Sequence, residues 1–145
     1  MSPRIQELID MINRALTMEH AAAVQYLTHA ELIFGPESGP IMEQLREQAA
    51  DEQKHAENLR TLIADYLKGI PSYDQAQTKQ ATDYDQIINV NIASEKEAIV
   101  LYQQIYDKIK EIKVDLGHNY FTLEHDIRHI LMEEAQHITE LERIQ

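Results

Sequence analysis

Two short segments of the sequence place a glutamate three residues before a histidine, as Glu52 with His55 and Glu134 with His137. Side chains three residues apart lie on the same face of an α-helix, so each segment would project a carboxylate and an imidazole in one direction. Each pair directly follows another acidic residue and lies in a strongly helical stretch. Carboxylates and imidazoles are ligands of several transition metals, so the two segments predict a common metal site.

Two more glutamates, Glu19 and Glu95, lie in the middle of apolar stripes that follow helical periodicity. A single inward glutamate is more often a stray acid that reaches solvent or pairs with a lysine or arginine. That explanation does not suit four such carboxylates together. Buried charges need partners, and the neighbouring inner positions offer no lysine or arginine. The sequence therefore predicts a cation held by one set of six ligands: Glu19, Glu52, His55, Glu95, Glu134 and His137.

Apolar periodicity predicts the helices that would position these ligands. The predicted helices span about residues 3–34, 40–68, 84–114 and 117–144. Ser2 and Pro3 form a favourable helix start, and Gly69 before Ile70–Pro71 is typical of a helix end. Only 4 glycines and 4 prolines occur, which argues against a β-rich fold. We expect an all-α fold in one domain, residues 1–145, built as a four-helix bundle.

Residues 70–83 carry no helical stripe and are predicted to form one long crossover. A helix of about 30 residues is about 45 Å long, and about 14 extended residues reach about 46 Å. The crossover can therefore span the whole bundle, which would make the second and third helices parallel. The link at Asp115–Gly117 is short, so the third and fourth helices should be antiparallel.

The six ligands are predicted to meet at one level of the bundle. Glu95 lies about 16 Å from the start of its helix and Glu134 about 13 Å from the end of its own, while Glu19 lies near mid-helix. Six ligands suit two ions better than one. Glu52 and Glu134 each lie one turn from a histidine and would bridge the ions, with Glu19 and Glu95 as terminal ligands. This oxygen-rich set favours iron or manganese over copper, with zinc as a substitute.

Composition excludes several other classes of function. The chain has no cysteine, so disulfides, thiolate catalysis and cysteine-ligated metal clusters are ruled out. A net charge of −12 repels nucleic-acid backbones and attracts cations. No apolar run approaches the length of a transmembrane helix, and the N-terminus lacks the apolar core of a signal peptide. We expect a cytoplasmic protein with no nucleic-acid or membrane partner.

The sequence also contains an internal repeat. The spacing from Glu19 to Tyr26 recurs from Glu95 to Tyr102, and a Glu-x-x-His pair follows in the next predicted helix of each half. The two halves are therefore interpreted as copies of one helical hairpin joined by the crossover.

With these ligands in this order and spacing, the whole chain resembles the ferritin-like di-iron carboxylate proteins. Within that superfamily it is most similar to bacterioferritins, whose pattern is also matched at Tyr26 and Asp51. The resemblance implies a ferritin-like bundle, two iron ions per subunit, and ferroxidase activity that oxidises Fe(II) with O2 or H2O2. It also implies a homo-oligomer, either a dimer or a dodecamer-type shell.

Three positions depart from the patterns of these relatives. Gln53 stands where bacterioferritins have the methionine that ligates haem, so we expect no haem. The sequence stops at Gln145, without the fifth helix that lines the pores of their 24-subunit cage, so that cage is not implied. Ala98 stands where rubrerythrins have a second inward glutamate. This favours a symmetric ferroxidase centre over a rubrerythrin-type peroxidase.

Four residues could act around the centre. Tyr26 and Tyr102 are either core aromatics or phenols that bond a ligand glutamate or supply an electron to the oxidant. Asp51 and Glu133 are either surface charges or hydrogen-bond acceptors that orient the histidine of the opposite pair.

The remaining histidines are not assigned to the centre. His118, His125 and His129 share a face predicted to point away from it, which favours a solvated face or subunit contact over a metal site. His20 lies off the inner stripe, and His29 borders it as a packing residue.

The sequence leaves three functions open. The first is a ferroxidase that serves iron storage or detoxification. The second is a di-iron oxidase or peroxide scavenger of the rubrerythrin or ferritin-like type that forms no cage. The third is a helical bundle whose site holds zinc or no metal and serves assembly.

Overall fold

A computed structural model describes residues 1–145 as an all-α bundle without strands. The elements are α1 (Pro3–Ala30), α2 (Ser38–Thr61), the π-helical turn η1 (Leu62–Tyr66), α3 (Tyr84–Glu111), α4 (Lys113–Leu116) and α5 (Asn119–Arg143). The predicted four-helix bundle with a long crossover is confirmed. None of the helices combines the length and apolarity needed to span a membrane.

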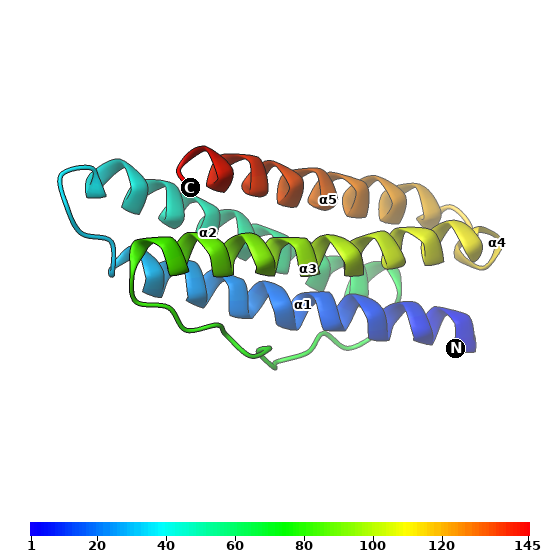
Figure 1. Ribbon diagram of the computed structural model, residues 1–145. Helices are drawn as coiled ribbons and strands as arrows, with labels where there is room; N and C mark the ends of the chain where they lie inside the picture. Colours follow the sequence, from blue (N-terminus) through cyan, green and yellow to red (C-terminus); the bar gives the residue numbers. More distant parts are fainter.

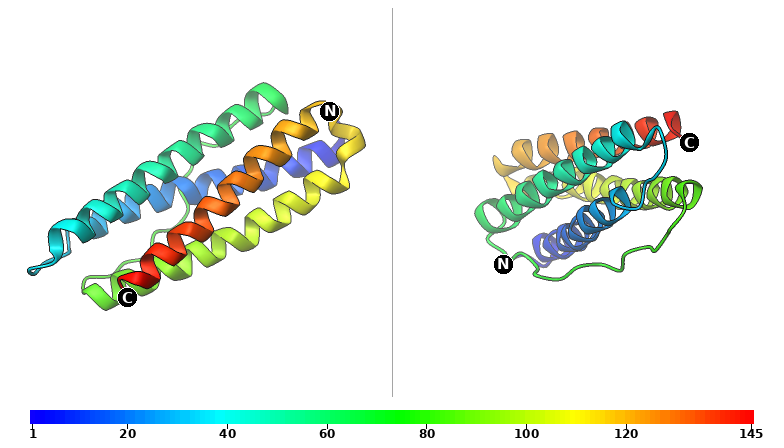
Figure 2. Two further views of the ribbon diagram at one scale, coloured as in Figure 1. Left: turned by 90° about the horizontal axis from the view of Figure 1, so that it is seen from above. Right: turned by 90° about the vertical axis from the view of Figure 1, so that its left-hand side faces the viewer.

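The helices pair as two hairpins (Figures 1 and 2). Contacts are most extensive between α1 and α2 and between α3 and α5. The segment between η1 and α3 returns along the outside of the bundle, past α1, to the opposite end. This crossover makes α2 and α3 run in the same direction, and α5 runs back against α3. The predicted helix directions are therefore those of the structure.

The apolar core is divided into two clusters along the bundle axis. A cluster of 20 buried residues draws on Leu8–Leu16 of α1 and Leu123–Ile130 of α5. A second cluster of 10 lies around Tyr26–Ile33 of α1 and Ile87–Ile92 of α3. On every long helix, the segment between these clusters carries the predicted ligands. The fold therefore buries a polar layer between two apolar ones.

Two predicted helix ends differ from the structure by three or more residues, and the predicted starts of the second and fourth helices differ by two. The first helix ends at Ala30 instead of residue 34, because Leu32 and Ile33 make three-residue turns onto the carbonyls of His29 and Ala30. The third does not continue to residue 114, since α3 ends at Glu111 and the short α4 follows. Both changes lie at the ends of the bundle and leave the ligand level unaffected.

The end of the second helix also differs in its mechanism. The residue with left-handed backbone at this helix end is Lys68, with φ 59°, although glycine more often takes that role. Gly69 is needed for space, because a Cβ there would lie 2.9 Å from Ile9 Cδ1 and 3.2 Å from Ile63 Cγ2. The backbone N–H of Gly69 donates to the Ile63 carbonyl at 2.8 Å. The start of the crossover is thus pressed against α1.

Further along, α1 holds the crossover by hydrogen bonds. Asn13 donates to the Ile70 carbonyl at 3.0 Å and accepts from the Ser72 backbone N–H at 2.8 Å. The backbone N–H of Ala76 donates to the Thr17 carbonyl at 2.9 Å. These bonds fix an irregular segment over the helix that carries Glu19.

Candidate metal centre

Four long helices bring the six predicted ligands together in the polar layer. Glu19 comes from α1, Glu95 from α3, and a Glu-x-x-His pair from each of α2 and α5. All six side chains are buried, with 0% to 3% of their residue surface exposed. Such burial of charged groups is costly without partners.

The six residues form two overlapping groups. Glu19, Glu52, His55 and Glu134 place one ligand atom each within 4.8 Å of one another. The second group, Glu52, Glu95, Glu134 and His137, meets the same limit. Glu52 and Glu134 belong to both groups, as expected of bridging carboxylates. Glu19 and Glu95 belong to one group each, as expected of terminal ligands.

Both imidazoles face the carboxylates through Nδ1. His55 Nδ1 lies 2.7 Å from Glu19 Oε2 and 3.3 Å from Glu134 Oε1. His137 Nδ1 lies 3.4 Å from Glu134 Oε1 and 3.5 Å from Glu95 Oε2. The two rings are 6.3 Å apart, centroid to centroid.

These short approaches are ion-pair contacts that lack the geometry of hydrogen bonds. Eight buried ligand atoms have no hydrogen-bond partner: both Nδ1 atoms, Glu19 Oε2, Glu95 Oε2, and both carboxylate oxygens of Glu52 and of Glu134. Buried polar groups are rarely left unpaired in native proteins. Atoms that converge without bonding one another are arranged as ligands around shared points. Four carboxylates would also balance the four positive charges of two divalent cations, so the residues fit a pair of metal ions.

The protonation of this centre reflects its crowded charges. Burial, followed by the charge of Glu134, raises the pKa of Glu19 to about 8 and that of Glu95 to about 7. The same causes raise the pKa of Glu52 well above its usual value. Burial by itself lowers the pKa of His55, but the carboxylates of Glu134 and Glu19 raise it to about 11. Without a cation, protons must offset the negative charge.

Two acids at the edge of the bundle hold the other ring nitrogens. His55 Nε2 contacts the Glu133 carboxylate of α5, and His137 Nε2 lies 3.0 Å from Asp51 Oδ2 of α2. The pairing is crossed between the two Glu-x-x-His helices, which is the second of the two roles considered for these acids in the sequence. When a cation replaces the proton on Nδ1, the proton held on Nε2 would leave the Nδ1 lone pair directed into the centre.

Comparison with known proteins identifies the family. A family model described as ferritin-like domain matches residues 9–145. The chain belongs to the ferritin family. Among solved structures, a ferritin-like, diiron-carboxylate protein from Bacillus anthracis str. Ames shares 26% identity and a TM-score of 0.89, covering 99% of both chains. No curated protein sequence matches the chain.

Two bacterioferritin-type structures are also similar to this ferritin-like protein. The dodecameric thioferritin of Bacteroides fragilis, a bacterioferritin-related protein, is 27% identical with a TM-score of 0.80, covering 96% of this chain and 84% of that one. The bacterioferritin of Desulfovibrio desulfuricans, described with a diiron site, is 25% identical with a TM-score of 0.85, covering 97% and 79%. The predicted resemblance to ferritin-like di-iron proteins and bacterioferritins is confirmed.

The two tyrosines of the ferritin-like centre are not equivalent. Tyr26 Oη donates to Glu95 Oε1 at 2.9 Å, so of the alternatives left open for this residue it makes the bond to a candidate ligand carboxylate on another helix. The Tyr102 hydroxyl is equally buried but has no hydrogen-bond partner. Burial, with the charges of nearby glutamates, raises the pKa of both phenols well above 10. The expected bond is therefore present for Tyr26 only.

A polar network next to the centre was missed in the sequence. Gln25 donates to Asn91 Oδ1 at 2.9 Å, and Asn91 Nδ2 lies 2.9 Å from His29 Nδ1. All three residues are buried. Asn91 lies one turn before Glu95 on α3. A polar residue at this inward-facing position was the feature of the sequence that could have indicated the network. His29 is thus a bonded core residue and not only a packing one.

The surface histidines lie apart from the centre. His118, His125 and His129 are all exposed at or on α5. The rings of His125 and His129 approach to 4.2 Å between centroids. His20 instead helps to hold the crossover, since its Nδ1 lies 2.7 Å from the Asp74 carbonyl oxygen.

Proposed function

We propose that this ferritin-like protein is a ferroxidase that holds two iron ions per subunit and oxidises Fe(II) to Fe(III) with O2 or H2O2. One observation carries the proposal: two four-residue ligand groups share Glu52 and Glu134 and leave their buried donor atoms unpaired. The oxygen-rich, imidazole-containing set suits iron, with manganese or zinc as substitutes.

Bound iron would supply the electrons, one from each Fe(II), and the protein would supply geometry and a dry site. Glu19 and His55 would hold one ion, and Glu95 and His137 the other. The two electrons, taken with two protons, would convert O2 to H2O2 or H2O2 to two waters. The buried acids and histidines would be close enough to supply these protons.

The residues around the ligands would position them. Asp51 and Glu133 would keep each imidazole turned with Nδ1 inward, through the contacts at Nε2. The Tyr26 hydroxyl would hold Glu95 by its bond of 2.9 Å, and this phenol would be the first candidate to supply an electron to the oxidant. Tyr102, without a bond partner, is the second candidate for that role.

We further propose that the protein acts as a homo-oligomer in iron storage or detoxification. The similar Bacteroides fragilis protein is described as dodecameric. The native mass of the particle decides between this role and its rival. A shell of about twelve subunits would support storage, whereas a dimer would favour an oxidase or peroxide scavenger without a cage.

The test of ferroxidase activity is an anaerobic Fe(II) titration followed by admission of air. We expect saturation near two Fe(II) per chain. Admission of air should then cause rapid oxidation, which is measured by ultraviolet absorbance. The double variant Glu52→Gln, Glu134→Gln should lose rapid oxidation, while Glu57→Gln, an exposed position on the same helix as Glu52, should keep it. Unchanged oxidation in the double variant would refute the ligand assignment.

A further inference from the structure

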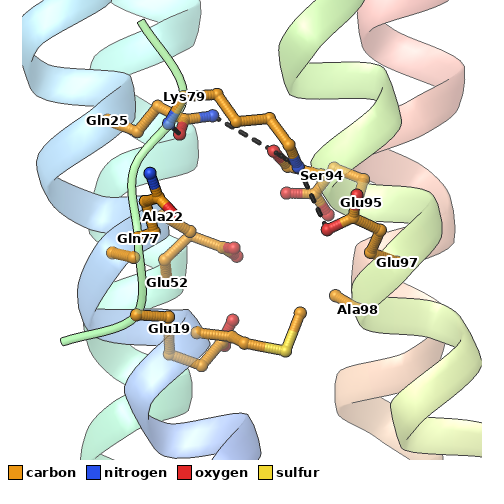
Figure 3. A pocket seen from close by; sticks show the side chains of 13 residues that line it. Glu19, Ala22, Gln25, Glu52, Gln77, Lys79, Ser94, Glu95, Glu97 and Ala98 are labelled. Atoms are coloured by element: carbon orange, nitrogen blue, oxygen red, sulfur yellow. Dashed lines mark hydrogen bonds and ion pairs between the residues drawn. The ribbon is translucent and has the colours of Figure 1, made fainter. Parts of the chain in front are cut away.

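A cavity between α1, α3 and the crossover leads from the surface to the candidate metal centre (Figure 3). Three of the candidate ligands, Glu19, Glu52 and Glu95, line it. They are buried, with 1%, 0% and 2% of their surface exposed, so they form its inner end. The cavity volume of about 80 Å³ is large enough for water or a cation to enter.

The mouth of this cavity carries an ion pair. Lys79 Nζ lies 3.0 Å from Glu97 Oε2, and the two side chains are 35% and 61% exposed. Lys79 Nζ also donates to Ser94 Oγ at 3.0 Å. Figure 3 shows the lysine reaching from the crossover to α3, with Glu52 and Glu19 below it in this view.

The backbone of Lys79 is fixed on the other side of the opening. Its N–H donates to Gln25 Oε1 of α1 at 2.6 Å. Gln25 in turn donates to Ser94 Oγ of α3 at 3.2 Å. One residue of the crossover therefore connects both walls of the cavity, with its backbone on α1 and its charge on α3.

We propose that this cavity is the port through which Fe(II) reaches the centre, and that Glu97 is the first carboxylate to bind the cation. The Lys79–Glu97 pair then determines how readily a divalent cation passes. This inference rests on the ferroxidase function proposed above, because it assigns a route to that substrate.

The charges at the mouth explain why the Lys79–Glu97 pair would control the entry of cations and not the entry of the oxidant. Glu97 at the mouth and three carboxylates at the inner end form a series of oxygen ligands from the surface inward. Lys79 neutralises the first of them, so an arriving cation must displace Nζ from Glu97. A partly exposed ion pair is weak enough for such exchange. An uncharged oxidant meets no comparable electrostatic barrier.

The test measures the rate of Co(II) binding, which is followed by visible absorbance and needs no turnover. Lys79→Gln leaves Glu97 unpaired, so it should bind Co(II) roughly threefold faster or more at low salt. Glu97→Gln leaves an unpaired positive charge at the mouth and should slow binding by a similar factor. Both effects should shrink at high ionic strength. The double variant should return toward the wild-type rate.

Two controls separate the port from general charge effects. Lys110→Gln makes the same change in net charge, but Lys110 lies beside Tyr106 and away from the cavity, so its rate should stay at the wild-type value. Lys79→Arg keeps the charge and should also bind at the wild-type rate. The amount of Co(II) bound, near two per chain, should not change in any of these variants.

The outcomes distinguish this inference from the proposed function. If wild type binds two Co(II) per chain but Lys79→Gln and Glu97→Gln change the rate in the same direction, or not at all, the port is refuted and the centre stands. If wild-type protein binds no Co(II), the proposed function fails and the port with it.

Discussion

Each candidate histidine ligand offers one ring nitrogen to the centre and the other to an acid at the edge of the bundle. Nδ1 of His55 and of His137 faces the carboxylates, and Nε2 meets Glu133 or Asp51 from the opposite helix. The acids are partly exposed, at 56% for Glu133 and 48% for Asp51, while the imidazoles are buried. An exposed charge thus sets the orientation of a buried ligand.

At this scale we expect Asp51→Asn and Glu133→Gln each to weaken metal binding by about 10- to 100-fold. The physical reason is that each acid fixes the proton on Nε2 and raises the basicity of Nδ1. Zn(II) titration by calorimetry measures the change. Glu47→Gln, an exposed position on α2, should bind as wild type does. Wild-type affinity in both edge variants would contradict the orienting role.

The positions of the candidate ligands could be predicted because each is a polar residue at a position where helical periodicity calls for an apolar one. Glu19 and Glu95 are visible in this way, and so are the two Glu-x-x-His pairs. The different bonding of Tyr26 and Tyr102 could not be predicted, since periodicity gives the face of a helix and not the rotation of its neighbours. The contacts of Lys79 depend on the path of an irregular crossover, which has no sequence period.

Among the elements, the crossover depends on its first residues for its position. The π-helical turn ends α2, Lys68 takes left-handed backbone, and Gly69 then passes close to Ile9. The helix stop was predicted, whereas its geometry depends on contact with α1 and was not. An element without regular structure is thus positioned by close packing at one end and by hydrogen bonds along its length.

We therefore expect Gly69→Ala to destabilise the protein by about 1–3 kcal/mol, because the added Cβ would meet Ile9 and Ile63. Urea unfolding measures the loss. Gly39→Ala is the matched control, since a Cβ there meets nothing within 4 Å. In the first turn of α2 it should be neutral or stabilise by roughly 0.4–1 kcal/mol. Equal effects of the two variants would mean that the contact with Ile9 relaxes freely.

For the whole molecule, the polar layer makes stability depend on pH when no cation is bound. The pKa of Glu19 rises on folding from 4.5 to about 8, chiefly through burial, and that of Glu95 to about 7. Between pH 4.5 and these values the folded state binds more protons than the unfolded chain. The free energy of unfolding must then fall as pH rises. The raised pKa of His55, about 11, acts in the same direction above pH 6.5.

The thermal midpoint of EDTA-treated protein should accordingly decrease from about pH 5 to about pH 8. Zn(II) should raise the midpoint most at the alkaline end, because the cation replaces protons that are no longer available. Differential scanning calorimetry at a series of pH values makes the measurement. Glu19→Gln cannot titrate and should show a weaker pH dependence. A midpoint that increases with pH in the metal-free wild type would refute this account.

The two ligand groups have one more consequence for the molecule. The first group takes three members from the hairpin of α1 and α2 and only Glu134 from the other hairpin, and the second group reverses this with Glu52. Neither hairpin alone can complete a four-ligand group. Metal binding at both ligand groups therefore requires that the two hairpins are docked in register. If two chains exchanged hairpins, each bundle would still contain both complete ligand groups.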